Sequence, residues 1–285
     1  RGPVRDGRLK PEITASGTNV VSTGRNNGYS SGYGTSHSAP FVTSVWALLT
    51  ERYKQLHSNS LPKTALLKNI ICNTGDDRGN PGPDYQWGFG LINPRKAVET
   101  IEQNRYFTNS VSTGITHTQN ISVPANTKQV KVMLYWHDKE ASPLAVNALV
   151  NDLDLSVSSN NTVYLPWVLN TTPALVNNDA TRAIDRLNNI EQVTIDNPAS
   201  SITISVNGFN IPSGPQEFFI SYEFIKEEIV LEHPYGGERF NPGSAEVIRW
   251  NTSDNSTNPF TVELSLDDGA TWSVINNNVP ATTNR

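Results

Sequence analysis

The spacing of apolar residues changes near residue 105, and this change constrains the fold of the 285-residue chain more than any other feature. Before it, in segment 40–55, apolar side chains cover most of a helical surface, which predicts a buried helix. After it, apolar and polar residues alternate in four segments, 128–136, 152–157, 201–206 and 217–224. Alternation is typical of half-buried strands. The sequence therefore predicts helical structure first and an antiparallel β-sandwich after it.

Composition excludes several classes of protein. The chain has a net charge of -5, a sequence pI near 5.6 and no cluster of basic residues, which argues against nucleic acid or an anionic membrane as partner. No apolar run is long enough to span a bilayer. The single cysteine, Cys72, lies in an apolar segment and is expected to be a buried thiol, so no disulfide framework is possible.

The segment 34–40, GTSHSAP, is the strongest candidate for a chemical site. A glycine-rich stretch precedes it and the predicted helix follows it. Because Pro40 is tolerated only near a helix start, the helix should begin at about Ser36 to Ser38, with the Ser36 hydroxyl at its amino-terminal end. Unpaired N–H groups and the positive end of the helix dipole there suit a developing oxyanion. The alternative is that this serine only caps a core helix.

GTSHSAP resembles the GTSxxxP segment around the nucleophile of subtilisin-like serine proteases. Segments 8–23, 64–75 and 86–98 resemble other landmarks of the same family, in the same order. The resemblance implies that Ser36 is the nucleophile, that its N–H forms half of the oxyanion hole, and that Thr35 supports that hole. It also implies that Gly34 and Tyr33 bind substrate.

The resemblance also implies that the rest of the catalytic triad lies upstream. In subtilisin, the standard example, the chain order is Asp, His, Ser. The 35 residues before Ser36 contain Asp6 but no histidine. None of the five histidines, His37, His57, His117, His137 and His233, is expected to be the base. His37 stands where the family commonly has methionine and is expected to shape the site.

The chain is therefore interpreted as the C-terminal fragment of a secreted or cell-surface serine endopeptidase, inactive without the upstream part of the same catalytic domain. Its substrate would be a protein or peptide. The alternative is a non-catalytic binding or adhesion protein whose protease domain is degenerate.

Three domains are predicted. Residues 1–105 would be the C-terminal part of an α/β subtilisin-like domain, 106–225 an all-β, antiparallel, jelly-roll-like sandwich, and 226–285 a partial Ig-like β module. The segments 150–157 and 210–222 resemble the sandwich that some bacterial subtilisin-like proteases carry after the catalytic domain.

A metal site is a further possibility in the sandwich. Asp152 and Asp154 share one strand face and, with Asn151, offer oxygen atoms of the kind calcium binds. A solvated polar face is the alternative, so structural calcium is possible but no ligands are assigned. No cofactor is expected for catalysis.

Overall fold

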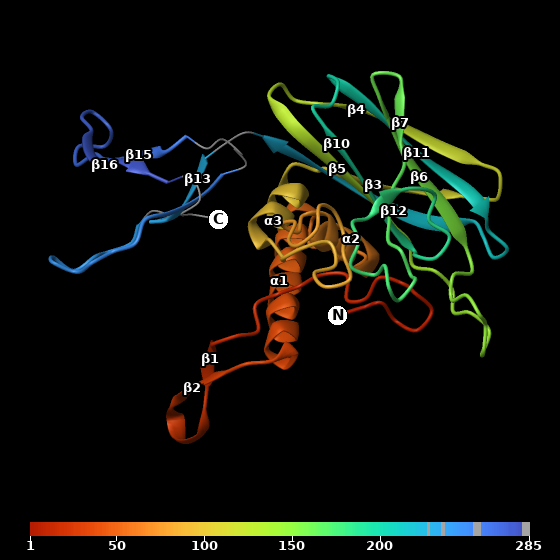
Figure 1. Ribbon diagram of the computed structural model, residues 1–285, viewed down its shortest axis with the longest axis horizontal. Coiled ribbons are helices and arrows are strands. Elements are labelled where there is room, and N and C mark those ends of the chain that lie inside the picture. The colour runs from red at the N-terminus through yellow and green to blue at the C-terminus, as the bar shows by residue number, and fades with distance from the viewer. Residues whose placement is uncertain (227–228, 235–236, 253–257, 281–285) are drawn as a thin grey trace. The chain divides into compact units, whose positions relative to one another are not determined.

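The computed structural model describes the chain except for residues 227–228, 235–236, 253–257 and 281–285 (Figure 1). It divides into two compact units, residues 1–125 with 129–224, and residues 126–128 with 225–285. Strands predominate over helices in the described residues. The helices are α1 (Thr35–Leu56), α2 (Thr64–Asn73) and α3 (Pro94–Glu102).

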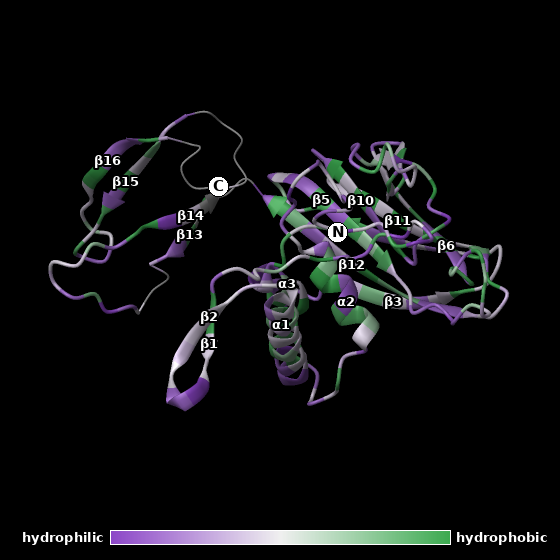
Figure 2. Ribbon diagram, turned by 60° about the horizontal axis from the view of Figure 1, so that its bottom comes forward, coloured by the Kyte–Doolittle hydropathy of each residue, from purple (hydrophilic) through white to green (hydrophobic). Residues whose placement is uncertain are grey.

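A small hairpin precedes α1. Strand β1 (Val20–Thr23) pairs antiparallel with β2 (Tyr29–Gly32), and a 3-10 turn, η1 (Arg25–Asn27), connects them. The tip of the hairpin is hydrophilic (Figure 2). Both figures show the hairpin beside α1.

Two four-stranded sheets form the sandwich. Their strand orders are β10-β5-β12-β3 and β4-β11-β6-β7, and a short pair, β8 with β9, lies outside them. The registered pairs in both sheets are antiparallel. The strands are β3 (Tyr106–Val111), β4 (Thr116–Ser122), β5 (Thr127–Tyr135), β6 (Asp152–Ser159), β7 (Thr162–Tyr164), β8 (Trp167–Val168), β9 (Thr181–Arg182), β10 (Ile190–Asp196), β11 (Ser201–Asn210) and β12 (Gln216–Lys226). The four alternating segments thus correspond to β5, β6, β11 and β12; the jelly-roll topology stays a prediction.

The first unit contains two hydrophobic cores that share one sheet. Leu134 of β5 and Phe218 of β12 belong to the core between the sheets. Their neighbours Met133 and Phe219 belong to a second core that includes α1, α2 and α3. Because adjacent residues of a strand face opposite sides, the β5–β12 sheet is apolar on both faces. The helices therefore pack directly on the sandwich. The domain boundary at residue 105 stays a prediction.

Two buried asparagines tie α2 to this sheet. The Asn69 amide donates to the carbonyl oxygens of Met133 (2.9 Å) and Phe219 (3.1 Å). Asn73, one turn later, donates to the carbonyl of Ser221 at 3.2 Å. Side chains on one face of α2 thus bind backbone carbonyl groups of β5 and β12.

Helix α1 differs from the prediction of a buried helix. Only Val45 and Leu49 are buried, whereas Phe41 is 43% exposed and Leu48 is 62% exposed. The reason is that one side of α1 packs into the core that it shares with α2 and α3, and no described segment covers the other side.

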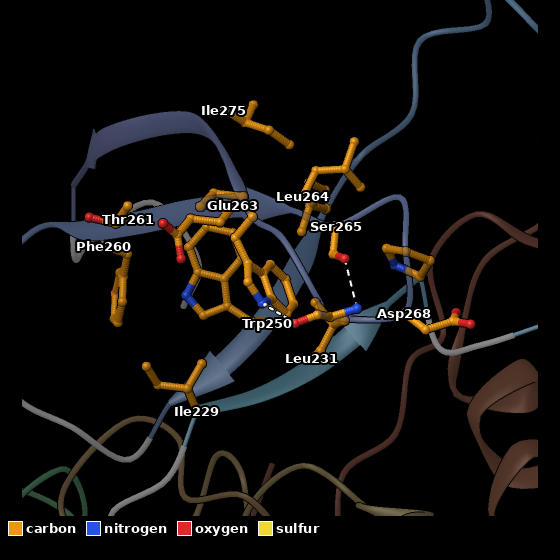
Figure 3. Close-up of a pocket in the computed structure, with 15 residues that line it drawn as sticks. Ile229, Leu231, Trp250, Phe260, Thr261, Glu263, Leu264, Ser265, Asp268 and Ile275 are labelled. Carbon is orange, nitrogen blue, oxygen red and sulfur yellow. Dashed lines mark hydrogen bonds between the residues drawn. The ribbon is translucent and has the colours of Figure 1, made fainter.

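The second unit consists of two strand pairs. Strand β13 (Ile229–His233) pairs with β14 (Arg249–Thr252), and β15 (Phe260–Leu264) pairs with β16 (Ser273–Val279). A largely apolar cleft of about 630 Å³ lies between the pairs (Figure 3). The β structure predicted for this segment is present in the described residues, and the Ig-like assignment stays a prediction.

Candidate active site

Ser36 is the second residue of α1 and its side chain is exposed. The helix begins at Thr35, one residue before the predicted start. No hydrogen bond to the Ser36 hydroxyl or to its backbone N–H occurs in the part of the chain that the structure describes. Because the first N–H groups of a helix have no partner within the helix, Ser36 combines an available oxygen with available donors.

Two glycines set the entry into α1. Gly34 has φ +131° and ψ 164°, a conformation that residues with a side chain rarely adopt. Its N–H donates to the Gly17 carbonyl at 2.7 Å, and its carbonyl accepts from the His37 N–H at 3.0 Å. A Cβ on Gly17 would clash with the Ser38 hydroxyl and lie 2.7 Å from the Gly34 carbonyl oxygen. The two backbones therefore approach closely, which fixes the direction in which Ser36 leaves the helix start.

Pro40 lies further inside the helix than predicted, at its sixth residue. Proline has no N–H, so the Ser36 carbonyl lacks the usual donor four residues ahead. The Ser44 hydroxyl donates to the Pro40 carbonyl at 2.9 Å, one turn later. The first turn of α1 is thus held by the Gly17–Gly34 contact rather than by a complete helical hydrogen-bond ladder.

The histidines nearest in sequence do not provide a base beside Ser36. The His37 ring lies over Gly32 of β2, where a Cβ on Gly32 would clash with it. His57 is the C-cap of α1, so the rise of a helix places it about 30 Å from Ser36. Its ring stacks on Tyr53 at 3.9 Å, and its Nε2 lies 3.0 Å from the Tyr106 hydroxyl. These contacts give His57 a structural role at the opposite end of the helix.

The remaining histidines belong to other parts of the fold. His117 lies on β4, with Nδ1 3.2 Å from Asn109 Nδ2, and His137 follows β5. His233 ends β13 in the second unit. The described residues around Ser36 thus supply a hydroxyl and N–H donors, and the close contact of Gly17 is a feature that sequence reasoning missed.

Two of the three candidate calcium residues contact an arginine, whereas the Asn151 amide donates to Ser213 and Gln216. Arg186 pairs with both Asp152, at 3.2 Å, and Asp154, and its guanidinium lies 3.7 Å from the centre of the Phe209 ring. Burial raises the pKa of Asp152 to about 6. Among the described residues, no three His, Cys, Asp or Glu side chains are grouped to hold a metal ion. Structural calcium therefore stays a prediction, with Arg186 as a competing cation.

Two further observations concern chemistry and environment. Cys72 is buried, and burial raises the pKa of its thiol to about 12, as expected of an unreactive structural thiol. Within the described ranges, no helix has the length and apolar character needed to cross a membrane.

Residues 1–90 match the Subtilase family, Peptidase_S8. We call this matched stretch the subtilase segment. This segment includes Ser36, the entry into α1, and α2 with its two asparagines.

Three curated relatives extend this result. The serine protease/ABC transporter B family protein tagA of Dictyostelium discoideum is 26% identical over 258 residues, covering 77% of this chain and 15% of the relative. The PII-type proteinase of Lactococcus lactis subsp. cremoris is 35% identical over 121 residues, 36% of this chain and 6% of its own. The minor extracellular protease Epr of Bacillus subtilis (strain 168) is 38% identical over 81 residues, covering 28% of this chain and 12% of the relative.

These alignments differ in extent. The subtilase segment is less than a third of the chain, so the similarity to tagA, over 77% of the chain, must include part of the sandwich. The chain in turn spans 15% or less of the length of these three relatives. It is therefore similar to a small part of much longer proteases.

Proposed function

We propose that this chain belongs to a secreted or cell-surface serine endopeptidase in which Ser36 attacks the peptide carbonyl. The single observation that carries the proposal is the exposed hydroxyl of Ser36 at the N-terminal end of a 22-residue helix, inside the segment that matches the subtilase family. The relatives named as proteases support a protein or peptide as substrate.

In the proposed reaction, Ser36 Oγ bonds to the peptide carbonyl carbon as its proton passes to a general base. The carbonyl oxygen becomes an oxyanion, which the Ser36 N–H would stabilise at the positive end of α1. Thr35 would support this oxyanion hole, and Gly34 and Tyr33 would bind the substrate. The amine then leaves with a proton, and water hydrolyses the acyl-enzyme.

The base, its orienting carboxylate and a second oxyanion donor are proposed to come from upstream of these residues. A serine hydroxyl without a base is a weak nucleophile at neutral pH. The isolated chain is therefore expected not to hydrolyse casein. Hydrolysis by the isolated chain would show that a base lies within it.

The decisive experiment uses a longer protein that contains the upstream region. A fluorophosphonate probe is expected to label it at Ser36, and Ser36→Ala is expected to abolish both labelling and casein hydrolysis. Ser44→Ala, an exposed serine two turns along the same helix, is the matched control and should keep both. Labelling that persists in Ser36→Ala would contradict the assignment, and a longer protein without labelling or hydrolysis would favour the non-catalytic binding protein.

A further inference from the structure

A carboxyl group occupies a core-facing position of the sandwich. On β10, Glu191 shares a face with Val193 and Ile195, because alternate residues of a strand point the same way. Both of those residues belong to the core between the two sheets. Glu191 is only 1% exposed. The proposed proteolysis does not use this residue.

Glu191 forms a hydrogen bond that joins the two sheets. Its Oε2 accepts the backbone N–H of Leu155 at 2.7 Å. β10 is the edge strand of one sheet and β6, which carries Leu155, belongs to the other (Figure 1). β7 pairs with β6 only from Val157 to Ser159, so Leu155 lies beyond the end of that pairing. The side chain of Glu191 thus replaces a strand partner for the Leu155 N–H.

The second oxygen of Glu191 has no such contact. Oε1 is buried and has no hydrogen-bond partner among the described residues. An ionised carboxylate in that position would lack compensation for the lost water, whereas a neutral carboxyl costs much less to bury.

The acidic groups that act on Glu191 also favour its neutral form. They are Asp185, in the loop before β10, and Asp154 and Asp152 of β6. Arg186 is a positive charge that also interacts with Glu191, but its guanidinium is paired with Asp152 and Asp154. Burial, and then the charge of Asp185, raise the pKa of Glu191 well above its ordinary value, whereas the Leu155 N–H lowers it. Burial, the largest of these effects, outweighs that hydrogen bond.

We propose that the Glu191–Leu155 contact is a pH-sensitive clasp between the sheets, closed while Glu191 is neutral and loosened when the carboxyl gives up its proton to solvent. The direction follows from linkage. An opened clasp exposes Glu191 to water, where it ionises at lower pH than in the closed form. Rising pH therefore favours opening from the ordinary pKa of glutamate up to the raised pKa of the closed form, and the clasp is firmest in acid.

Hydrogen exchange of the β6 backbone tests this directly, because the Leu155 amide is the donor of the clasp. In the full chain, the protection factor of Leu155, corrected for intrinsic exchange, is expected to fall with rising pH from 5 to 9, by up to about tenfold per pH unit within the titration window. Glu191→Gln keeps an acceptor and cannot ionise, so its decline should be smaller. Glu140→Gln removes an exposed carboxyl and should behave like the wild type. The same decline in wild type and Glu191→Gln would overturn the proposal.

The pKa of Asp152 is also raised, so its contribution to the fall in Leu155 protection must be separated from that of Glu191. The pKa of Asp152 is about 6, and its contribution to opening ends near that pH. Asp152→Asn should therefore change the decline only below about pH 6. A decline from pH 5 to 9 that disappears entirely in Asp152→Asn would assign the effect to Asp152 and overturn the role of Glu191.

A second measurement does not depend on a variant. Carboxyl carbon NMR of the wild-type chain should show Glu191 titrating well above the pH at which exposed glutamates titrate. Ordinary titration of this carboxyl would overturn the clasp. The clasp would also be overturned if added calcium restored the protection of Leu155 at pH 9 and a chelator removed it. That result would mean that a cation binds between the two sheets. None of these readouts involves Ser36, so they are independent of the proposed proteolysis.

Discussion

Helices α1 and α2 are both rich in apolar residues, yet they are embedded to very different degrees. Eight of the ten residues of α2 are buried. In α1, only Val45 and Leu49 of 22 residues are buried. The difference arises because α2 lies against a sheet that is apolar on both faces, whereas α1 touches the helical core along one side. The comparison suggests that α2 anchors the subtilase segment to the sandwich and that α1 presents Ser36.

The largest effect expected from this difference is at Asn69. Asn69→Asp would replace an amide donor by a carboxylate facing the carbonyl oxygens of Met133 and Phe219. An uncompensated buried charge should lower the free energy of unfolding by about 3–5 kcal/mol, measured by urea denaturation. Asn104→Asp, at an exposed position after α3, is the control and should change little. Equal effects of the two substitutions would show that α2 is not anchored in this way.

The next largest effect is expected when a buried side chain of α2 is shortened and a cavity is left. Ile70 is fully buried, so Ile70→Ala should cost about 2–5 kcal/mol of unfolding free energy. Leu48→Ala on the exposed side of α1 should stay within about 0.5 kcal/mol. If Leu48→Ala proved as costly as Ile70→Ala under the same denaturation conditions, the two helices would be equally embedded.

A smaller effect is expected where the chain enters α1. Gly34 has a backbone conformation that strains other residues, so Gly34→Ala should cost about 1–3 kcal/mol. Gly28→Ala is the matched control, because Gly28 has φ -108° and only one close neighbour, the Arg25 carbonyl oxygen, at 3.4 Å from an added Cβ. In the longer protein, Gly34→Ala should also slow fluorophosphonate labelling. Labelling at the wild-type rate would mean that this glycine does not position Ser36.

The smallest effect on stability is expected at Ser36 itself. Its side chain is exposed and has no hydrogen bond among the described residues, so Ser36→Ala should change the free energy of unfolding by less than about 0.5 kcal/mol. Denaturation of the isolated chain measures this without activity. A large destabilisation would mean that the serine is structural, which is the capping alternative.

Local sequence patterns predicted much of this architecture. The alternating segments correspond to β5, β6, β11 and β12, and α1, which starts within GTSHSAP, begins within one residue of its expected start. These features depend on neighbours in the chain, namely the strand period, the helix period and the position of Pro40. The burial of α1 was overestimated because periodicity shows which face is apolar but not whether another segment covers it.

The polar contacts required the tertiary structure. Asn69 and Glu191 are polar residues that a sequence pattern would place in solvent, yet one binds two strand carbonyls and the other joins two sheets. The sequence by itself determined where helices and strands begin and placed Ser36 at a helix start, because these depend on residues close in the chain. Only the tertiary structure decided which polar groups are buried and what they contact, because their partners lie 36 to 150 residues away along the chain.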